Sequence, residues 1–398
     1  MRHLIPMAIT IQEILTQINL VISPHTDTPE LDAQVLVAHF LDKPRSWVLA
    51  HPEAHINDQQ YNKMIQGLDR LEHGEALPYV IGHWEFFGFD FHLTPDVLIP
   101  RPETELLVER GMSWLQNHPN QCMVIDVGTG SGCIGIALAK TITDLSVFMT
   151  DISPNALKVA RINAKKYGLS DRLEFRLTDL LDGITGQYDL ICANLPYIPS
   201  QVLSKLPVAE SEPLLALDGG YRGTELISRL LDQARSCLAP DGLMLVEIES
   251  SQGAEVKTMA GSFFPGAKVE ILKDLSGWDR CIEITPSRHL IHLCTHRDWQ
   301  NAQEQGILIS KSLSQEGFIH CSQPQQILEV ANRFYKGIPG LVLLWIDPEK
   351  NTSEIRWEAA EGTLFPHIYG PINLDAVVLV TDFVPDDDGT YRVLQLPV

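Results

Sequence analysis

The sequence lacks an excess of basic residues. Thirty Lys and Arg stand against 51 Asp and Glu among 398 residues, and the formal net charge is −21. We see no local cluster of Lys and Arg that would override this charge, so the chain as a whole repels polyanions. Nucleic acid is therefore disfavoured as a direct substrate, whereas a protein partner with a basic surface would be attracted.

The sequence also lacks Cys-x-x-Cys pairs and long apolar runs. No run approaches the roughly 20 apolar residues that a membrane span needs, and Gln12 and Glu13 interrupt the opening too soon for a secretory signal. Helical periodicity begins just after Met7, so either Met1 or Met7 could be the start. The seven scattered cysteines favour buried free thiols in a reducing, cytoplasmic compartment; they are Cys122, Cys133, Cys192, Cys237, Cys281, Cys294 and Cys321.

The length predicts two or three domains rather than one core. Residues 8–75 are expected to form a helical bundle that docks the substrate or only supports the rest, with Asp58 as an N-cap and Gly74 as a helix stop. Alternating residues around Gly88 predict a β-hairpin linker over 76–98. Helical spacing in the bundle is carried by Ile11, Ile14, Leu15 and Ile18, by Leu31, Val35 and Ala38, and by Tyr61, Met64, Ile65, Leu68 and Leu71.

Strands and helices alternate after this linker, which predicts an α/β domain over 99–285 with a parallel sheet covered on both faces. The expected strands are 122–127, 146–151, 173–177, 188–193 and 243–247, and the expected helices are 134–139, 154–167, 224–238 and 252–260. An antiparallel hairpin of 269–272 and 281–284 would close the sheet.

The pattern changes after residue 287, which predicts a separate α+β domain over 288–398. Expected strands are 289–294, 317–321, 341–346, 355–358 and 377–381, with helices at 298–305 and 325–335. No internal repeat relates this domain to the preceding one.

A glycine-rich turn, Asp-Val-Gly-Thr-Gly-Ser-Gly over 126–132, follows the first predicted strand of the sheet. A doubly wound sheet binds its ligand at this point, beyond the carboxyl ends of the strands, and glycines let the backbone approach that ligand. We expect Asp126 to accept from the methionine amino group of S-adenosylmethionine, and Asp151 to accept from both ribose hydroxyls. Asp179 could accept from the adenine amino group or cap a helix. Such turns also serve nicotinamide and flavin cofactors, so the turn alone does not identify the ligand.

The tetrapeptide Asn-Leu-Pro-Tyr, 194–197, follows the apolar strand 188–193. The nitrogen of an amide or aromatic amine is a weak nucleophile, so an enzyme must align it with the methyl donor and accept its hydrogens. The Asn194 side chain and the Leu195 backbone carbonyl can accept them, Pro196 stiffens the loop, and Tyr197 can pack on the planar group. Proximity would supply much of the catalysis. The two motifs together predict methyl transfer to nitrogen; a plain strand-terminating turn is the alternative.

Four segments in order resemble the peptide chain release factor N5-glutamine methyltransferase family over residues 8–285. They are 98–105 (LIPRPETE), 126–132, 194–197 and 212–220 (EPLLALDGG). The resemblance implies a Rossmann-like class I methyltransferase fold. It also implies methylation, by S-adenosylmethionine, of the glutamine amide in the Gly-Gly-Gln motif of class I release factors, with the helical N-terminal region gripping that partner.

The resemblance also implies roles for individual residues. Arg101 joins residues 194–197 as a candidate for substrate binding, and residues 194–197 are also the catalytic candidates. Four positions depart from the family pattern. Leu195 stands in place of the first proline of the commoner Pro-Pro pair, and Leu180 stands where relatives can place an aromatic residue beside adenine. Ala209 and Ser211 stand where an arginine and an aromatic residue are usual. Cofactor-binding candidates are Asp126, Gly128, Thr129, Gly130, Ser131, Gly132, Asp151, Asp179, Leu180 and Asn194.

The C-terminal domain resembles the uncharacterised DUF952 family through 316–322 (EGFIHCS) and 365–370 (FPHIYG), and its fold is similar, more weakly, to ADP-ribosyltransferases. A His, Tyr and Glu set could bind a nicotinamide nucleotide, although a histidine on an apolar strand is commonly a core residue. No metal is expected, because the adjacent His320 and Cys321 point to opposite strand faces. The residues to follow are His320, Glu358, His367 and Tyr369.

Two rival hypotheses remain. An adenine-N6 methyltransferase needs the same grip on an amino group, but the acidic charge and the missing basic patch count against it. Alternatively, the C-terminal domain is a nucleotide-binding or NAD-binding module that carries the main activity, with the methyltransferase as its scaffold.

Overall fold

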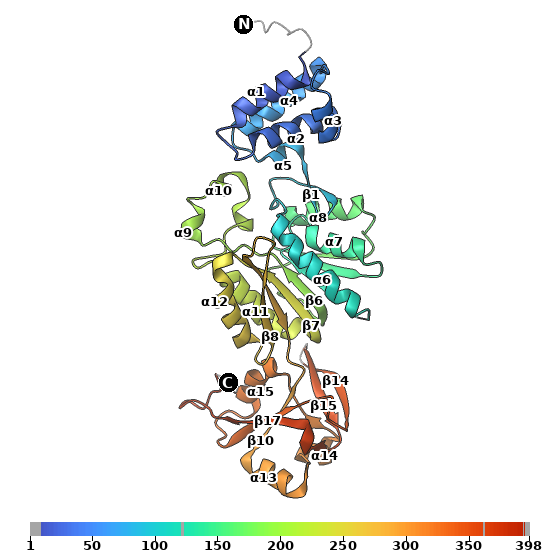
Figure 1. The fold of residues 1–398 in the computed structure, drawn as a ribbon. Coiled ribbons are helices and arrows are strands. Elements are labelled where there is room, and N and C mark those ends of the chain that lie inside the picture. The colour runs from blue at the N-terminus through green and yellow to red at the C-terminus, as the bar shows by residue number, and fades with distance from the viewer. Residues whose placement is uncertain (1–8, 121–122, 361–362, 393, 395–398) are drawn as a thin grey trace.

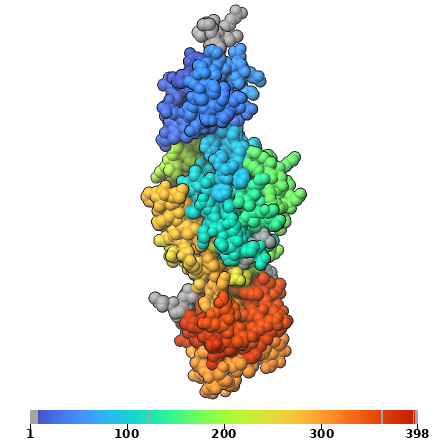
Figure 2. Space-filling model, turned by 45° about the vertical axis from the view of Figure 1, so that its right-hand side comes forward, coloured from blue at the N-terminus to red at the C-terminus, as the bar shows by residue number. Residues whose placement is uncertain are grey.

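The computed structural model describes residues 9–120, 123–360, 363–392 and 394. The molecule is elongated, with a helical part at one end, a large sheet in the middle and the C-terminal part at the other end (Figures 1 and 2). The expectations for Met1, Met7 and Cys122 lie outside the described residues. Within the described ranges, no helix combines the length and the apolar character needed to cross a membrane.

Five helices form the N-terminal part: α1 (Ile11–Ile22), α2 (Pro29–Leu41), α3 (Arg45–Ala50), α4 (Asp58–Glu72) and α5 (Leu77–Ile81). Thr10 starts α1 because its hydroxyl accepts from the Glu13 backbone while the Glu13 carboxylate accepts in return. Asn57 starts α4 in the same way, so the prediction of Asp58 as the N-cap was wrong by one residue.

The helix predicted from the spacing of Leu31, Val35 and Ala38 is confirmed by α2. Leu31 is exposed and Val35 is half-buried, whereas the buried residues of this helix are Ala33, Leu36, Val37 and Ala38. This helix is apolar on nearly all sides, so spacing alone could not indicate which side meets the other helices.

A short hairpin connects the helices to the sheet. Its strands, β1 (His83–Phe86) and β2 (Phe89–His92), are joined by Phe87 and Gly88, whose φ angles are 54° and 73°. Two positive φ values suit the tight turns that match strand twist. The hairpin is shorter than predicted, because residues 77–81 form α5 and residues 93–101 are irregular.

The central sheet has the strand order β5-β4-β3-β6-β7-β9-β8. The pairs from β5 to β7 are parallel, and β9 runs antiparallel to both β7 and β8. This confirms the predicted α/β class and the closing hairpin. The strands are β3 (Met123–Val127), β4 (Ser146–Asp151), β5 (Leu173–Leu177), β6 (Tyr188–Ala193), β7 (Leu238–Glu247), β8 (Lys268–Lys273) and β9 (Asp279–Thr285).

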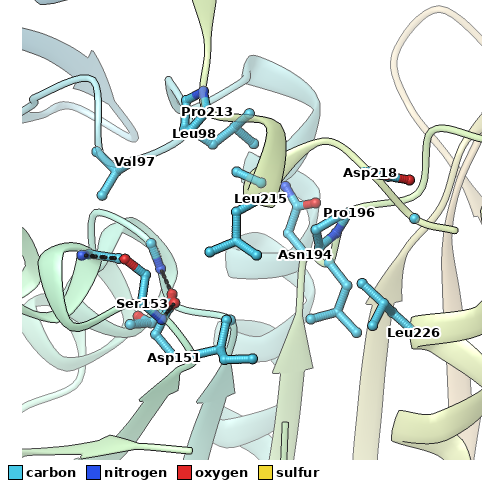
Figure 3. Close-up of a pocket in the computed structure, with 18 of the residues that line it drawn as sticks. Val97, Leu98, Asp151, Ser153, Asn194, Pro196, Pro213, Leu215, Asp218 and Leu226 are labelled. Carbon is cyan, nitrogen blue, oxygen red and sulfur yellow. Dashed lines mark hydrogen bonds between the residues drawn. The ribbon is translucent and has the colours of Figure 1, made fainter. Parts of the chain in front are cut away.

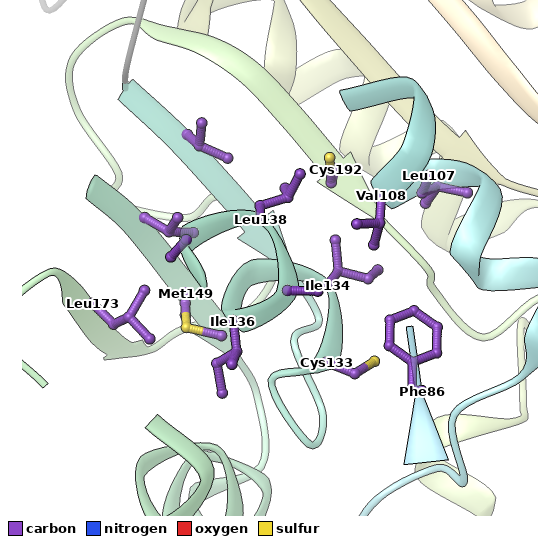
Figure 4. Packing of buried hydrophobic residues seen from close by; sticks show 14 of the residues in the cluster. Phe86, Leu107, Val108, Cys133, Ile134, Ile136, Leu138, Met149, Leu173 and Cys192 are labelled. Carbon is purple, nitrogen blue, oxygen red and sulfur yellow. The ribbon is translucent and has the colours of Figure 1, made fainter. Parts of the chain in front are cut away.

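Helices cover both faces of this sheet and bury two apolar cores. One core lies under α6 (Glu105–Asn117), α7 (Cys133–Thr141) and α8 (Pro154–Lys166), and the other under α11 (Glu225–Cys237) and α12 (Gly253–Phe263). Figure 4 shows α7 packed into the first core. All six cysteines in the described ranges are free and buried, which confirms that prediction for them.

The C-terminal part has two three-stranded sheets, β10-β13-β17 and β12-β15-β14. The prediction missed β15 (Thr363–Tyr369) because Pro366, which cannot donate to a ladder, lies in its middle. The other elements are β10 (Leu290–Thr295), α13 (His296–Gln305), β11 (Ile307–Leu308), α14 (Lys311–Glu316), β12 (Ile319–His320), α15 (Ile327–Phe334), β13 (Leu341–Ile346), β14 (Glu354–Ala360), β16 (Ile372–Asn373) and β17 (Val377–Phe383).

Candidate active site

A cavity of about 610 Å³ opens beyond the carboxyl ends of β3, β4 and β6. Figure 3 shows Asp151 and Ser153 on one side, Asn194 and Pro196 facing them, and Leu215 above. The volume lies within the roughly 300–1,000 Å³ of small-molecule sites. The strand order changes direction at β3, and a doubly wound sheet binds its ligands at such a point.

The glycine-rich turn between β3 and α7 forms one wall. Gly128, Gly130 and Gly132 have φ angles of 70°, 55° and 85°, which other residues rarely adopt. A Cβ at Gly130 would meet nothing within 4 Å, whereas one at Gly128 would approach a methyl of Leu195 to 2.9 Å. Thr129 and Ser131 also line the cavity. The turn therefore presents backbone to the cavity and packs closely against the loop after β6.

Asp126 lies behind this turn and does not line the cavity. Its Oδ2 accepts from the Thr129 hydroxyl at 2.6 Å and from the Gly135 N–H at 3.0 Å. Its Oδ1 is buried, and none of the described residues hydrogen-bonds it. Burial raises the pKa of Asp126 to about 6. The carboxylate thus holds the turn with one oxygen and has acceptor capacity left on the other.

Asp151 ends β4 at the cavity, and its two oxygens accept from the N–H groups of Gly130 (2.9 Å) and Ser153 (2.8 Å). Burial raises its pKa, an effect that these N–H groups oppose. Asp179 also lines the cavity and forms an ion pair of 2.7 Å with Arg229. No helix begins at Asp179, so the alternative that it caps one is wrong. Leu180, beside it, is buried in the wall at a φ of 53°.

Asn194 is held by a chain of hydrogen bonds that spans distant parts of the sequence. Its Nδ2 donates to the Thr104 hydroxyl at 2.9 Å, and that hydroxyl donates to Glu247 at 2.7 Å. The Tyr197 hydroxyl donates to the other oxygen of Glu247 at 3.3 Å. Asn194, Leu195 and Pro196 line the cavity, whereas Tyr197 turns its hydroxyl toward Glu247 and is not part of the lining.

Glu247 is the last residue of β7 and is only 1% exposed. Burial raises its pKa to about 7, although the hydroxyls of Thr104 and Tyr197 oppose the shift. Burial likewise raises the pKa of Tyr197. The sequence patterns predicted no role for Thr104 or Glu247. One signal was available for Glu247, because an acidic residue ends the apolar strand β7. This strand pairs in parallel with β6, so both end at the same edge of the sheet and Glu247 comes close to Asn194.

The 212–220 segment supports the loop that carries Asn194. The Gly219 N–H donates to the Ile198 carbonyl at 2.9 Å, and the Gln252 side chain donates to the Tyr197 carbonyl at 3.0 Å. A Cβ at Gly219 would lie 2.7 Å from both the Pro196 carbonyl oxygen and the Tyr197 Cα. Only glycine allows this backbone-to-backbone approach.

We expect Gly219→Ala to lower the free energy of unfolding by about 1–3 kcal/mol, as overpacking does, and to slow turnover by displacing the loop. Urea denaturation and initial rates measure the two effects. Gly261→Ala is the matched control, because a Cβ there, inside α12, meets nothing within 4 Å. Equal stability of the Gly219 variant and the wild type would contradict the expected contact.

Arg101 does not line the cavity. Its guanidinium pairs with Glu212, whose other oxygen accepts from the Ile99 N–H at 3.1 Å. The Glu212 side chain is only 4% exposed, against 34% for Arg101. The pair therefore ties the 98–105 segment to the 212–220 segment, and both segments contribute other residues to the cavity lining.

We expect Arg101→Ala to destabilise the protein by about 1–3 kcal/mol, because it leaves the buried Glu212 carboxylate without its charged partner. Chemical denaturation measures this loss. Arg222→Ala, which breaks the exposed pair with Glu255, should cost at most about 1 kcal/mol. The double variant Arg101→Ala/Glu212→Gln should recover part of the loss; strictly additive losses would argue against the pairing.

The four C-terminal candidates also lie together, on the β12-β15-β14 sheet. Glu358 accepts from His367 and, at 2.9 Å, from the Tyr369 hydroxyl, and the rings of His320 and His367 have centroids 5.1 Å apart. Phe318 stacks on His367 at 4.2 Å. The His320 side chain is half exposed, so it is not a core histidine. None of these residues lines the cavity described above.

Three family models match separate parts of the chain. They are the PrmC N-terminal domain over residues 13–82, the methyltransferase small domain over 103–210, and a protein of unknown function (DUF952) over 293–380. The order of these matches follows the order of the helical part, the large sheet and the C-terminal part in the structure.

Individual proteins match the first two of these parts. A release factor glutamine methyltransferase of Moorella thermoacetica is 40% identical over 257 residues, which are 64% of this chain and 90% of that protein. One of Koribacter versatilis is 37% identical over 261 residues, 65% of this chain and 91% of that protein. Among solved structures, protein CC0527 from Caulobacter crescentus is 31% identical and covers 26% of this chain and 93% of its own, with a TM-score of 0.25.

Proposed function

Because the chain belongs to the release factor glutamine methyltransferase family, we propose that its cavity methylates the glutamine side-chain amide in the Gly-Gly-Gln motif of class I release factors. S-adenosylmethionine is the methyl donor. The observation that carries the proposal is that the glycine turn of 126–132 and the loop of 194–197 form walls of one cavity.

The residues around the cavity suit this cofactor. Gly130 leaves open space beside the turn, Asp126 has a buried oxygen without a described partner, and Asp151 offers a carboxylate at the end of β4. When bound, S-adenosylmethionine supplies a methyl group activated by a sulfonium. We assign its binding to the residues predicted from the sequence: Asp126, Gly128, Thr129, Gly130, Ser131, Gly132, Asp151, Asp179, Leu180 and Asn194.

The loop after β6 positions the substrate amide. The Asn194 Oδ1 and the Leu195 carbonyl accept the two amide hydrogens, which orients the nitrogen and keeps its lone pair available. Most of the rate enhancement then comes from proximity and orientation. The Leu195 side chain packs against Gly128. Leucine has the same backbone carbonyl as the commoner proline, and this carbonyl is the only part of residue 195 that the substrate needs. Arg101 acts on the substrate indirectly, through the segment that it ties to Glu212.

The partner and the location follow from the same assignment. We propose that the enzyme acts in the cytoplasm and serves translation termination, and that naked nucleic acid is not a substrate, because a net charge of −21 disfavours polyanions. We also propose the domain limits of 8–75 for substrate docking, 76–98 for the linker, 99–285 for catalysis and 288–398 for the C-terminal domain.

Mass spectrometry of the Gly-Gly-Gln peptide tests the assignment directly. We expect one added methyl group on the glutamine after incubation of purified release factor with the enzyme and S-adenosylmethionine, and none when a Gly-Gly-Glu factor replaces it. Naked DNA incubated with labelled cofactor serves as the comparison. Label on DNA with an unmodified release factor would reject the proposed substrate in favour of adenine.

A further inference from the structure

Glu247 is a buried carboxylate in an unusual position. It is 1% exposed, and no Lys or Arg within the described ranges is in ion-pair distance of it. Its hydrogen-bond donors are the hydroxyls of Thr104 and Tyr197. Burying a carboxylate without a cation destabilises the folded protein. We therefore look for the role of Glu247 in function and not in stability.

The directions of the hydrogen bonds suggest that role. An ionised carboxylate can only accept, so Thr104 must give it its single hydroxyl proton. The Thr104 oxygen is then left with lone pairs alone, and it can only accept from the Asn194 amide nitrogen, as observed at 2.9 Å. The Asn194 Oδ1 is consequently turned away from Thr104, and none of the described residues donates to it.

We propose that Glu247 is a positioning residue that acts through Thr104 and keeps the Asn194 side chain oriented with its carbonyl toward the substrate amide. The inference rests on the proposed function. An asparagine amide has two orientations of almost equal shape. In the reversed orientation, N–H groups of Asn194 would face the N–H groups of the substrate. The carboxylate removes that alternative before the substrate arrives, as preorganised sites require.

The relay from Glu247 to Asn194 should make turnover depend on pH. Burial raises the pKa of Glu247 to about 7, so the carboxylate is ionised above that pH. Once protonated, Glu247 can donate to Thr104, which frees the Thr104 hydroxyl to donate to the Asn194 carbonyl and stabilise the reversed amide. Turnover should therefore fall as pH decreases through about 7. Other titratable or charged groups facing Glu247 from the packed elements are Glu103, Cys133, Tyr197, Arg280 and Cys281.

Substitutions on the full-length enzyme test the relay. Thr104→Val and Glu247→Leu each remove one link with an apolar group and should lower kcat about 10- to 100-fold, with cofactor affinity largely kept. Thr104→Ser keeps the hydroxyl and should stay close to the wild type. The double variant Thr104→Val/Glu247→Leu should lose no more than either single one, because both break the same chain. Glu247→Gln should abolish the decrease of turnover near pH 7.

A second measurement does not depend on methylation. In protein with ¹⁵N-labelled asparagine and no release factor, the Asn194 side-chain resonance, assigned with Asn194→Ala, should shift with a midpoint near pH 7 and stay constant in Glu247→Gln. The relay would be overturned if Glu247→Leu kept the wild-type kcat, or if the fold losses in kcat of the two single variants multiplied in the double variant. It would also be overturned if Thr104→Ser lowered kcat as much as Thr104→Val, or if the Asn194 resonance did not change with pH. An inactive wild type that retains this shift would instead reject only the proposed substrate.

Discussion

Replacing Asn194 with alanine should reduce methylation of the release factor by about 100-fold or more, while cofactor binding is largely preserved. The variant loses the acceptor proposed to align the substrate amide, and removal of one such preorganised group in other enzymes costs about 10²- to 10³-fold in kcat. Initial rates measured by mass spectrometry of the Gly-Gly-Gln peptide give the loss, and calorimetric titration of S-adenosylmethionine gives the affinity.

Asn117→Ala provides the matched control for this prediction. Asn117 ends α6, and its side-chain Nδ2 donates to the Ser113 carbonyl of the same helix, at 2.7 Å. The same substitution there should therefore leave turnover unchanged. Turnover of Asn194→Ala equal to that of the wild type would remove the side chain from the mechanism. A thermal melt of each variant separates loss of function from loss of fold.

Replacing Asp151 with alanine should weaken S-adenosylmethionine binding by about 100-fold. Each hydrogen bond to an ionised carboxylate contributes about 1.5–3 kcal/mol, and the variant loses the acceptor proposed for the two ribose hydroxyls. It also releases the Gly130 N–H from the position that shapes the turn. Because the defect concerns the cofactor, we expect a rise in its KM that is larger than the fall in kcat.

Asp144 offers the control, since it precedes the same strand β4 at the opposite end and is exposed. Asp144→Ala should bind the cofactor as the wild type does. Unchanged affinity in Asp151→Ala, in a variant that melts at the wild-type temperature, would mean that the ribose is held by other groups.

The sequence predicted much of the central sheet because its signals are local. Strands β4, β5 and β6 have the bounds that the apolar runs indicated, and the strand–turn–helix at 123–141 follows from apolar residues and glycines that are neighbours in the chain. Local signals also misled. Pro366 concealed the strand β15, and the capping signal placed the N-cap of α4 one residue too late, at Asp58.

The sequence by itself determined the class of the fold, the order of the motifs and the residue types proposed to bind a cofactor and an amide, since each depends on periodicity or on a short segment. Only the tertiary structure decided which distant groups touch. Thr104 reaches Glu247 across 143 positions and Asn194 across 90, and Arg101 reaches Glu212 across 111. Such contacts depend on the order of strands in the sheet and on the loops that cross its edge, and no local pattern encodes either.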